Sequence, residues 1–113
     1  MHEFSIMQAA LETAGEKTRA AGATQIHRLT LRVGALSGVV PTALRFAFDA
    51  LKDQSLAAAA ELQIEEIPAA GWCAACAAEF AVADLQYECP RCHQLSGDLR
   101  RGKEMELASL EIS

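Results

Sequence analysis

The first 22 residues carry apolar side chains at the spacing of an amphipathic helix. The segment runs from Ser5 to Ala21, and its apolar face consists of Ile6, Met7, Ala10, Leu11 and Ala14. Ser5 and Gln8 have the spacing of a capping box, and Gly22 stands where a helix commonly ends. The pattern therefore predicts a helix that packs one face on a core.

A second helix is predicted to begin at Pro41, because proline is favoured in the first turn of a helix. Its shared apolar face consists of Leu44, Ala47, Phe48 and Leu51. The pattern ends near Asp53.

Three other segments have strand character: 25–33, 61–67 and 105–112. In the first, Leu29, Leu31 and Val33 alternate with polar residues. In the last, the alternation slips near Ala108 and Ser109, which either a β-bulge or burial on both faces would explain. His27 is two residues before Leu29 and therefore on the same face of the predicted strand, so we expect it to be buried at the end of that strand.

The order of these elements predicts an α+β fold, with two helices packed on one face of a small three-stranded mixed sheet. The central strand-helix-strand unit predicts a parallel pair with a right-handed crossover. Residues 69–102 differ in composition and interrupt the path to the last strand, so they are expected to form an inserted, zinc-ribbon-like module with four cysteines. The expected domains are residues 1–68 plus 103–113, and residues 69–102.

The composition narrows the class of protein further. The 113 residues are 51% apolar but only 5% aromatic, which predicts one core of aliphatic side chains. No apolar run approaches the ~20 residues of a membrane-spanning helix, and the first residues lack the pattern of a signal peptide, so we expect a cytoplasmic protein with no membrane partner. The net charge of −5 argues against a nucleic-acid partner.

Four cysteines form the strongest chemical signal. Two Cys-x-x-Cys pairs, separated by twelve residues, can surround one tetrahedral ion with Cys73, Cys76, Cys89 and Cys92. Thiols in a reducing compartment are more often metal ligands than disulfides. Trp72, Phe80 and Tyr87 are expected to form a small apolar floor, that is, a hydrophobic cluster next to the metal-binding cysteines. Four protein ligands leave no open coordination position, which indicates a structural zinc; iron in a rubredoxin-like site stays an alternative.

The amino terminus is a second candidate metal site. The Met1 amine, the His2 backbone nitrogen and the His2 imidazole Nδ1 can close adjacent chelate rings on one square-planar Ni(II) or Cu(II) ion. Glu3 could add a carboxylate or a backbone nitrogen. Taken alone, however, a histidine at position 2 is more often a solvated terminal residue.

Several segments together resemble the HypA/HybF hydrogenase maturation factors. They are Met1–Ser5, Val33–Val39, Leu44–Phe48, the two cysteine pairs and Glu104–Ile112, so the match spans essentially the whole chain. The resemblance implies a nickel metallochaperone for [NiFe]-hydrogenase, with nickel at His2 and zinc on the cysteines. It also implies a HypB-type GTPase and the hydrogenase large-subunit precursor as partners, and urease maturation proteins in some species.

One position departs from the family pattern. Some members have an acidic side chain in the loop before the second helix, where this chain has Val40, so a nickel ligand from that loop is in doubt. His93 follows Cys92 directly and is interpreted as a surface turn residue rather than a ligand.

Two other classes of function compete with metal delivery. One is a zinc-ribbon module that binds protein or nucleic acid and uses no second metal. The other is an enzyme, which is disfavoured because the chain lacks a Ser/His/Asp set, a glycine-rich phosphate loop and an open zinc position. Nickel affinity would separate metal delivery from the zinc-ribbon alternative.

Overall fold

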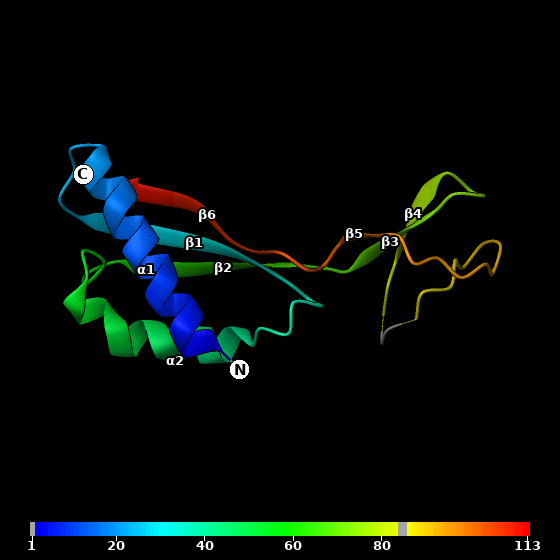
Figure 1. Ribbon diagram of the computed structural model, residues 1–113, viewed down its shortest axis with the longest axis horizontal. Helices are drawn as coiled ribbons and strands as arrows, with labels where there is room; N and C mark the ends of the chain where they lie inside the picture. Colours follow the sequence, from blue (N-terminus) through cyan, green and yellow to red (C-terminus); the bar gives the residue numbers. More distant parts are fainter. Residues whose placement is uncertain (1, 84–85) are drawn as a thin grey trace.

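The computed structural model describes residues 2–83 and 86–113. The molecule is elongated, with extents of 53 × 27 × 17 Å. A helix-and-sheet layer occupies one end and a smaller cysteine-bearing part occupies the other (Figure 1). We call residues 69–102 the cysteine module and the remaining residues the α/β unit.

The α/β unit contains the mixed sheet that the sequence predicted. Its strands are β1 (Ile26–Gly34), β2 (Glu61–Ile67) and β6 (Met105–Ile112), in the order β2-β1-β6. β1 is parallel to β2 and antiparallel to β6. The last strand therefore returns beside the first, and the cysteine module is inserted between β2 and β6.

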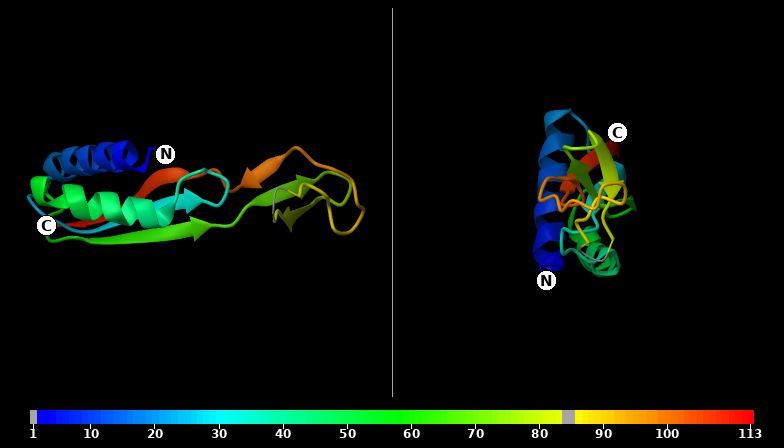
Figure 2. Two further views of the ribbon diagram at one scale, coloured as in Figure 1. Left: turned by 90° about the horizontal axis from the view of Figure 1, so that it is seen from below. Right: turned by 90° about the vertical axis from the view of Figure 1, so that its right-hand side faces the viewer.

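Two helices cover one face of this sheet, as Figure 2 shows. They are α1 (Glu3–Ala20) and α2 (Pro41–Leu51), and the short 3-10 helix η1 (Lys52–Gln54) follows α2. The fully buried side chains of the core include Met7, Ala14, Leu29, Leu31, Leu44 and Ala57. Burial of these aliphatic groups is the main stabilising contribution to the α/β unit.

The predicted start of α1 was wrong. The helix begins at Glu3 rather than Ser5, with His2 at the N-cap and no side-chain capping bond. Ser5 lies exposed inside the first turn, where the acidic Glu3 is favoured by the helix dipole. The other end agrees with the prediction, because Gly22 adopts φ 76° and its amide donates to the carbonyl of Arg19.

Two β-bulges explain the irregular strand patterns. The pairing of Thr30 with Ser109 and of Leu31 with Leu107 leaves Ala108 as an extra residue in β6, so a bulge causes the slip in alternation. A similar shift between Ile26 and Arg28 leaves His27 unpaired. The prediction that His27 is buried was therefore wrong: its ring is exposed, and Nε2 lies 2.6 Å from the Ser113 hydroxyl.

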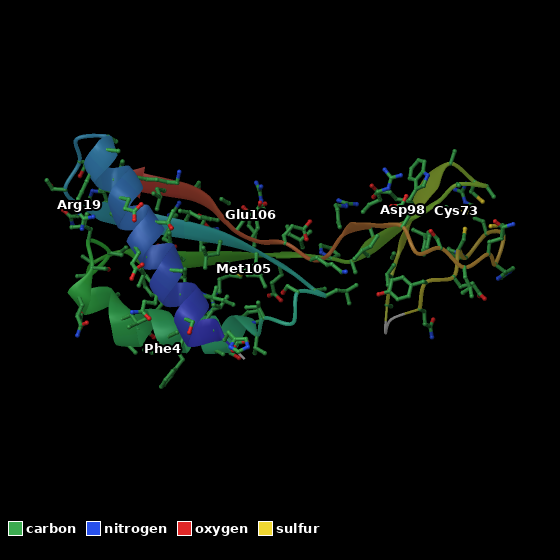
Figure 3. The ribbon with its side chains drawn as sticks, in the orientation of Figure 1. Phe4, Arg19, Cys73, Asp98, Met105 and Glu106 are labelled. Atoms are coloured by element: carbon green, nitrogen blue, oxygen red, sulfur yellow. The ribbon has the colours of Figure 1, made fainter. Side chains whose placement is uncertain are left out.

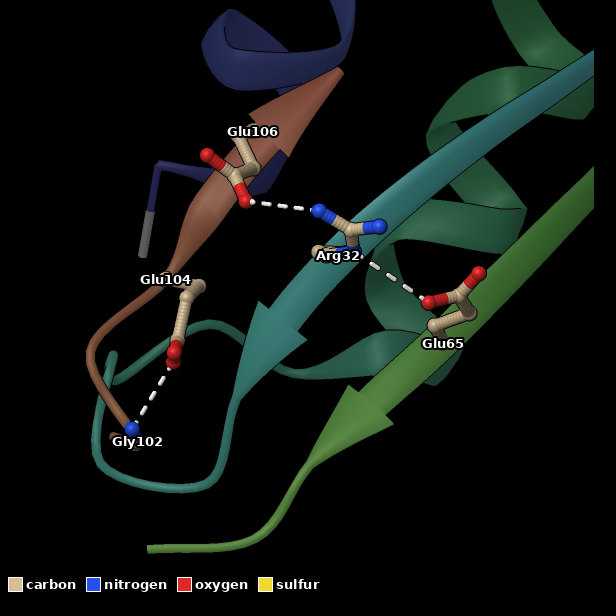
Figure 4. Close-up of polar contacts among 5 residues, drawn as sticks. All are labelled: Arg32, Glu65, Gly102, Glu104 and Glu106. Carbon is tan, nitrogen blue, oxygen red and sulfur yellow. Dashed lines mark hydrogen bonds and ion pairs between the residues drawn. The ribbon is translucent and has the colours of Figure 1, made fainter. Parts of the chain in front are cut away.

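The sheet face away from the helices is polar. Two arginines of β1 each lie between two glutamates of the neighbouring strands; Figure 4 shows Arg32 between Glu65 and Glu106, at 3.3 and 3.4 Å. Exposed pairs of this kind contribute little to stability. Their main consequence is a sheet face that stays solvated while the opposite face packs on the helices.

The cysteine module has its own small sheet. Its strands are β3 (Ala70–Cys73), β4 (Ala78–Ala81) and β5 (Leu99–Arg101), in the order β4-β3-β5. The sequence pattern did not predict these strands, which are only three or four residues long. A separate apolar cluster contains Ala69, Cys73, Phe80, Val82 and Cys89.

The loop after β1 connects the two parts of the molecule. The Ala35 amide donates to the carbonyl of Ile67 at 2.9 Å, and the Leu36 amide donates to the carbonyl of Gly102 at 2.6 Å. These bonds hold both chain segments that lead into the cysteine module. The Gly102 amide also donates to the Glu104 carboxylate at 2.8 Å, as Figure 4 shows.

Candidate metal sites

Each cysteine pair lies on a tight turn. Cys73 ends β3 and pairs with Ala78 at the start of β4, so Cys76 lies in the hairpin between the two strands. The second turn is closed by two backbone bonds between Cys89 and its successors: the His93 amide donates to the Cys89 carbonyl, and the Cys89 amide donates to the Gln94 carbonyl. Each turn therefore contributes its two sulfur atoms to one cluster.

The two turns share a backbone feature that no sequence pattern predicted. Ala77 and His93 each follow the second cysteine of a pair, and they have φ values of 51° and 63°. Among the described residues, they alone of the non-glycine residues have positive φ. Left-handed backbone at matching positions shows that the two turns have related geometry.

The four sulfur atoms face one another. All lie within 4.8 Å, and Sγ–Sγ distances are 3.5 Å for Cys73 and Cys92 and 3.9 Å for Cys76 and Cys89. A tetrahedral zinc with Zn–S bonds of about 2.3 Å has sulfurs about 3.8 Å apart. The donor set therefore fits a tetrahedral metal ion with little rearrangement.

The surroundings of the thiols also suit a cation. The backbone amides of Cys92 and Arg91 hydrogen-bond to Cys89 and lower the pKa of its thiol to about 6. Hydrogen bonds with the Cys92 and Cys73 thiols raise the pKa of Cys76 to about 12. Thiolates are the form that binds metal, so full deprotonation of the cluster is coupled to the arrival of a positive ion.

The aromatic floor is only partly as predicted. Phe80 is buried in the apolar cluster of the cysteine module and Tyr87 packs against it. Trp72 lies outside that cluster, with the Arg100 guanidinium 4.6 Å from its ring centroid. Trp72 therefore contacts a cationic side chain of β5 and does not join the apolar cluster that contains the cysteines.

The amino-terminal residues lie at the surface beside the two helices. His2 is exposed, and Glu3 lies in the same surface pocket, together with Phe4, Ser5, Ala43, Phe46 and Ala47. The prediction that Glu3 precedes the helix was wrong, because it is the first residue of α1 and accepts a hydrogen bond from Val40. Met1, the third predicted ligand, lies outside the described residues.

The two candidate sites are far apart on the molecule. Figure 1 shows the start of α1 beside α2 and the cysteine module beyond the far end of the sheet. In the described part of the chain, only the cysteines form a group of three or more metal-ligating side chains.

The other histidines do not join either site. His93 is exposed, as expected for a surface turn, and its Nδ1 lies 3.4 Å from a Glu88 oxygen. The sequence did not predict that the Val40 amide would contact Glu3, although Pro41 indicated that residue 40 precedes α2.

None of the helices over residues 2–83 and 86–113 has both the length and the apolar character needed to cross a bilayer.

The fold and the cysteine cluster define a small α+β protein with an inserted four-cysteine metal module. A family described as "Hydrogenase/urease nickel incorporation, metallochaperone, hypA" matches residues 1–112. The chain belongs to this HypA family of metallochaperones.

Individual relatives agree with the family match. The hydrogenase maturation factor HypA of a Picosynechococcus strain is 47% identical over 112 residues, which are 99% of each chain. The factor of the same name from Chloroflexus aurantiacus is 40% identical over 98% of each chain. The solution structure of the Ni metallochaperone HypA from Helicobacter pylori has a TM-score of 0.70 and 28% identity, covering 99% of this chain and 97% of that chain.

Proposed function

We propose that this protein binds Ni(II) through His2, Glu3 and the Met1 amine and delivers the ion during maturation of [NiFe]-hydrogenase. In this proposal zinc is held by Cys73, Cys76, Cys89 and Cys92 and supports the structure of the cysteine module. The protein delivers a metal and catalyses no reaction. The α/β unit is then the nickel-binding domain and residues 69–102 the zinc-binding domain, both in the cytoplasm.

The observation that carries the nickel proposal is the exposure of His2 beside Glu3 in one surface pocket. An exposed imidazole can exchange a metal with an incoming ligand, whereas a closed site would retain it. Neutral imidazole and nitrogen donors suit Ni(II). Family membership supports a HypB-type GTPase and the hydrogenase large-subunit precursor as partners, with urease maturation proteins as further candidates.

Zinc is proposed from the donor set and its geometry. Four thiolates at tetrahedral spacing fill the coordination sphere of zinc and leave no position for a substrate. Without the metal, the module has a small apolar cluster and three short strands to hold it together. Metal binding therefore contributes directly to the folding of residues 69–102.

Nickel titration of the zinc-loaded protein tests the proposal. Native protein should bind Ni(II), and His2→Ala should weaken binding by at least about a hundredfold, because a ligand and its chelate ring are lost. His27→Ala is the matched control, since this exposed histidine contacts Ser113 on another part of the surface. Equal nickel affinity of the native protein and His2→Ala would refute the N-terminal site and favour a zinc module without a second metal.

A further inference from the structure

Two phenylalanine side chains project from the helix layer next to His2 and Glu3. Phe46 is 76% exposed and Phe4 is 52% exposed, and both line the pocket that contains the two proposed nickel ligands. Figure 3 shows Phe4 on the helix layer and Cys73 at the other end of the molecule. Adjacent exposed aromatic residues commonly mark a surface that binds another molecule.

The fold does not need these side chains. The core-facing positions of α2 are occupied by Leu44, Ala47 and Phe48, all buried. Phe46 instead faces solvent from the same helix. An exposed phenylalanine loses the favourable free energy of burial, which a partner covering it would recover.

We propose that Phe4 and Phe46 form the docking surface for the protein that exchanges nickel with this chain. We further infer that this partner presents an apolar pocket bordered by lysine and arginine side chains. This inference rests on the proposed nickel function and adds the site and chemistry of the encounter. Ligand exchange needs the partner's donor atoms within bonding distance of the ion, and a partner seated on the two phenylalanines would cover His2 and Glu3.

The charges near the patch indicate a basic partner. Apart from His2, Glu3 is the only ionisable side chain among the described residues that line the pocket. Arg45 on α2 is directed to the carbonyl of Leu62 on β2, and Lys52 at the start of η1 is paired with Asp49. The pocket beside the two phenylalanines therefore carries negative charge at Glu3, which favours a positively charged partner surface and accelerates its approach.

The size of the patch argues for a transient partner rather than a second copy of the chain. Two phenylalanine side chains bury on the order of 200 Å² each, whereas a stable dimer buries about 800 Å² on each partner. A small apolar anchor with charged surroundings suits a complex that forms quickly and dissociates after the metal has moved.

Binding and transfer measurements with Phe46→Ser and Phe4→Ser test this surface. The probes are the nickel-free hydrogenase large-subunit precursor and the maturation GTPase of the same organism, each purified. For at least one probe, each substitution should raise the Kd by about tenfold or more and slow nickel transfer in proportion. Nickel affinity and zinc content should stay within about twofold of native.

Leu95→Ser is the matched control. Leu95 is 80% exposed but belongs to the cysteine module, so its substitution should leave both partner affinity and transfer unchanged. Asp49 is exposed on α2, three residues after Phe46. Asp49→Lys should therefore weaken the same complex if its border is basic, and added salt should reduce the difference between Asp49→Lys and native. Native affinity of both phenylalanine variants for both probes would overturn the proposal, as would failure of the native protein to bind either probe.

Two further outcomes distinguish the alternatives. If sedimentation shows a native dimer that Phe46→Ser converts to a monomer, the surface belongs to a second copy and the partner proposal is wrong. If the native protein binds no nickel, the proposed function fails. If it binds nickel and the phenylalanine variants dock normally, only this inference fails.

Discussion

The carboxylate of Glu3 accepts a hydrogen bond from the backbone amide of Val40, with an oxygen–nitrogen distance of 3.0 Å. The bond joins the first turn of α1 to the residue that precedes α2. Val40 has no side-chain oxygen to offer a metal, but its main-chain N–H contacts the carboxylate of a proposed nickel ligand. The loop before α2 therefore contacts the amino-terminal site through the backbone amide of Val40.

This bond predicts a specific pH dependence of stability in the nickel-free protein. The Val40 amide lowers the pKa of Glu3 below its ordinary value of 4.5, because the hydrogen bond favours the ionised form. A lowered folded-state pKa adds stability above the ordinary value, and that contribution is lost as pH falls through the folded-state pKa. Urea unfolding should therefore show Glu3→Gln less stable than native at neutral pH.

The difference between native and Glu3→Gln should shrink as pH falls from 4.5 through the lower pKa of folded Glu3, because the carboxylate then becomes protonated and uncharged like glutamine. Glu16→Gln is the control, because this exposed residue lies on the same helix but outside the first turn. A stability difference that is independent of pH would show that the Glu3 charge contributes nothing through Val40.

Loss of one cysteine should separate the two parts of the molecule. In Cys73→Ser, metal content should fall to near zero and residues 69–102 should lose their ordered structure, because their small apolar cluster contains Cys73 itself. The α/β unit has a separate core and should remain folded. Metal analysis and amide NMR spectra test this. Retention of one zinc per chain, or collapse of the α/β signals, would contradict it.

The left-handed residue after the first cysteine pair predicts a stabilising substitution. Ala77 has φ 51°, which costs an alanine about 1 kcal/mol relative to glycine. Ala77→Gly should therefore stabilise the metal-bound module by up to about 1 kcal/mol. Ala74→Gly, in the same turn but without positive φ, should be neutral or destabilising. Chelator-induced unfolding of the two variants and the native protein gives the comparison.

The sequence predicted the long elements well because their apolar periodicity reflects burial. The spacing of Leu29, Leu31 and Val33 placed β1 correctly, and all three are buried. The errors fall where backbone geometry overrides that pattern. His27 has the parity of its buried neighbours, but a bulge turns it to the surface, and the local sequence contains no sign of the extra residue.

In the candidate sites, too, the features predicted correctly are those that a local sequence pattern records. The spacing of the cysteines was sufficient to predict the four-sulfur cluster, because two short turns bring each pair together. The strands of the module could not be predicted, since segments such as Leu99–Arg101 are too short to show alternation. The contact between Glu3 and Val40 joins residues 37 positions apart through a backbone group, which no side-chain pattern records.

The junction between the two parts of the molecule gives a final prediction. A Cβ atom built on Gly34 would lie 2.2 Å from the Gly102 carbonyl group, so Gly34→Ala must push apart the β1 loop and the segment leading back to β6. That movement would disturb the Leu36–Gly102 backbone bond and should cost about 3 kcal/mol of unfolding free energy. Gly97→Ala is the control, because its Cβ would meet no atom within 4 Å and its φ is not positive. Urea unfolding of the zinc-loaded variants should show a large loss for Gly34→Ala and none for Gly97→Ala. Equal stability of the two variants would mean that the junction accommodates the extra methyl group without loss of free energy. The close approach of Gly34 to Gly102 would then not hold the two parts of the molecule together.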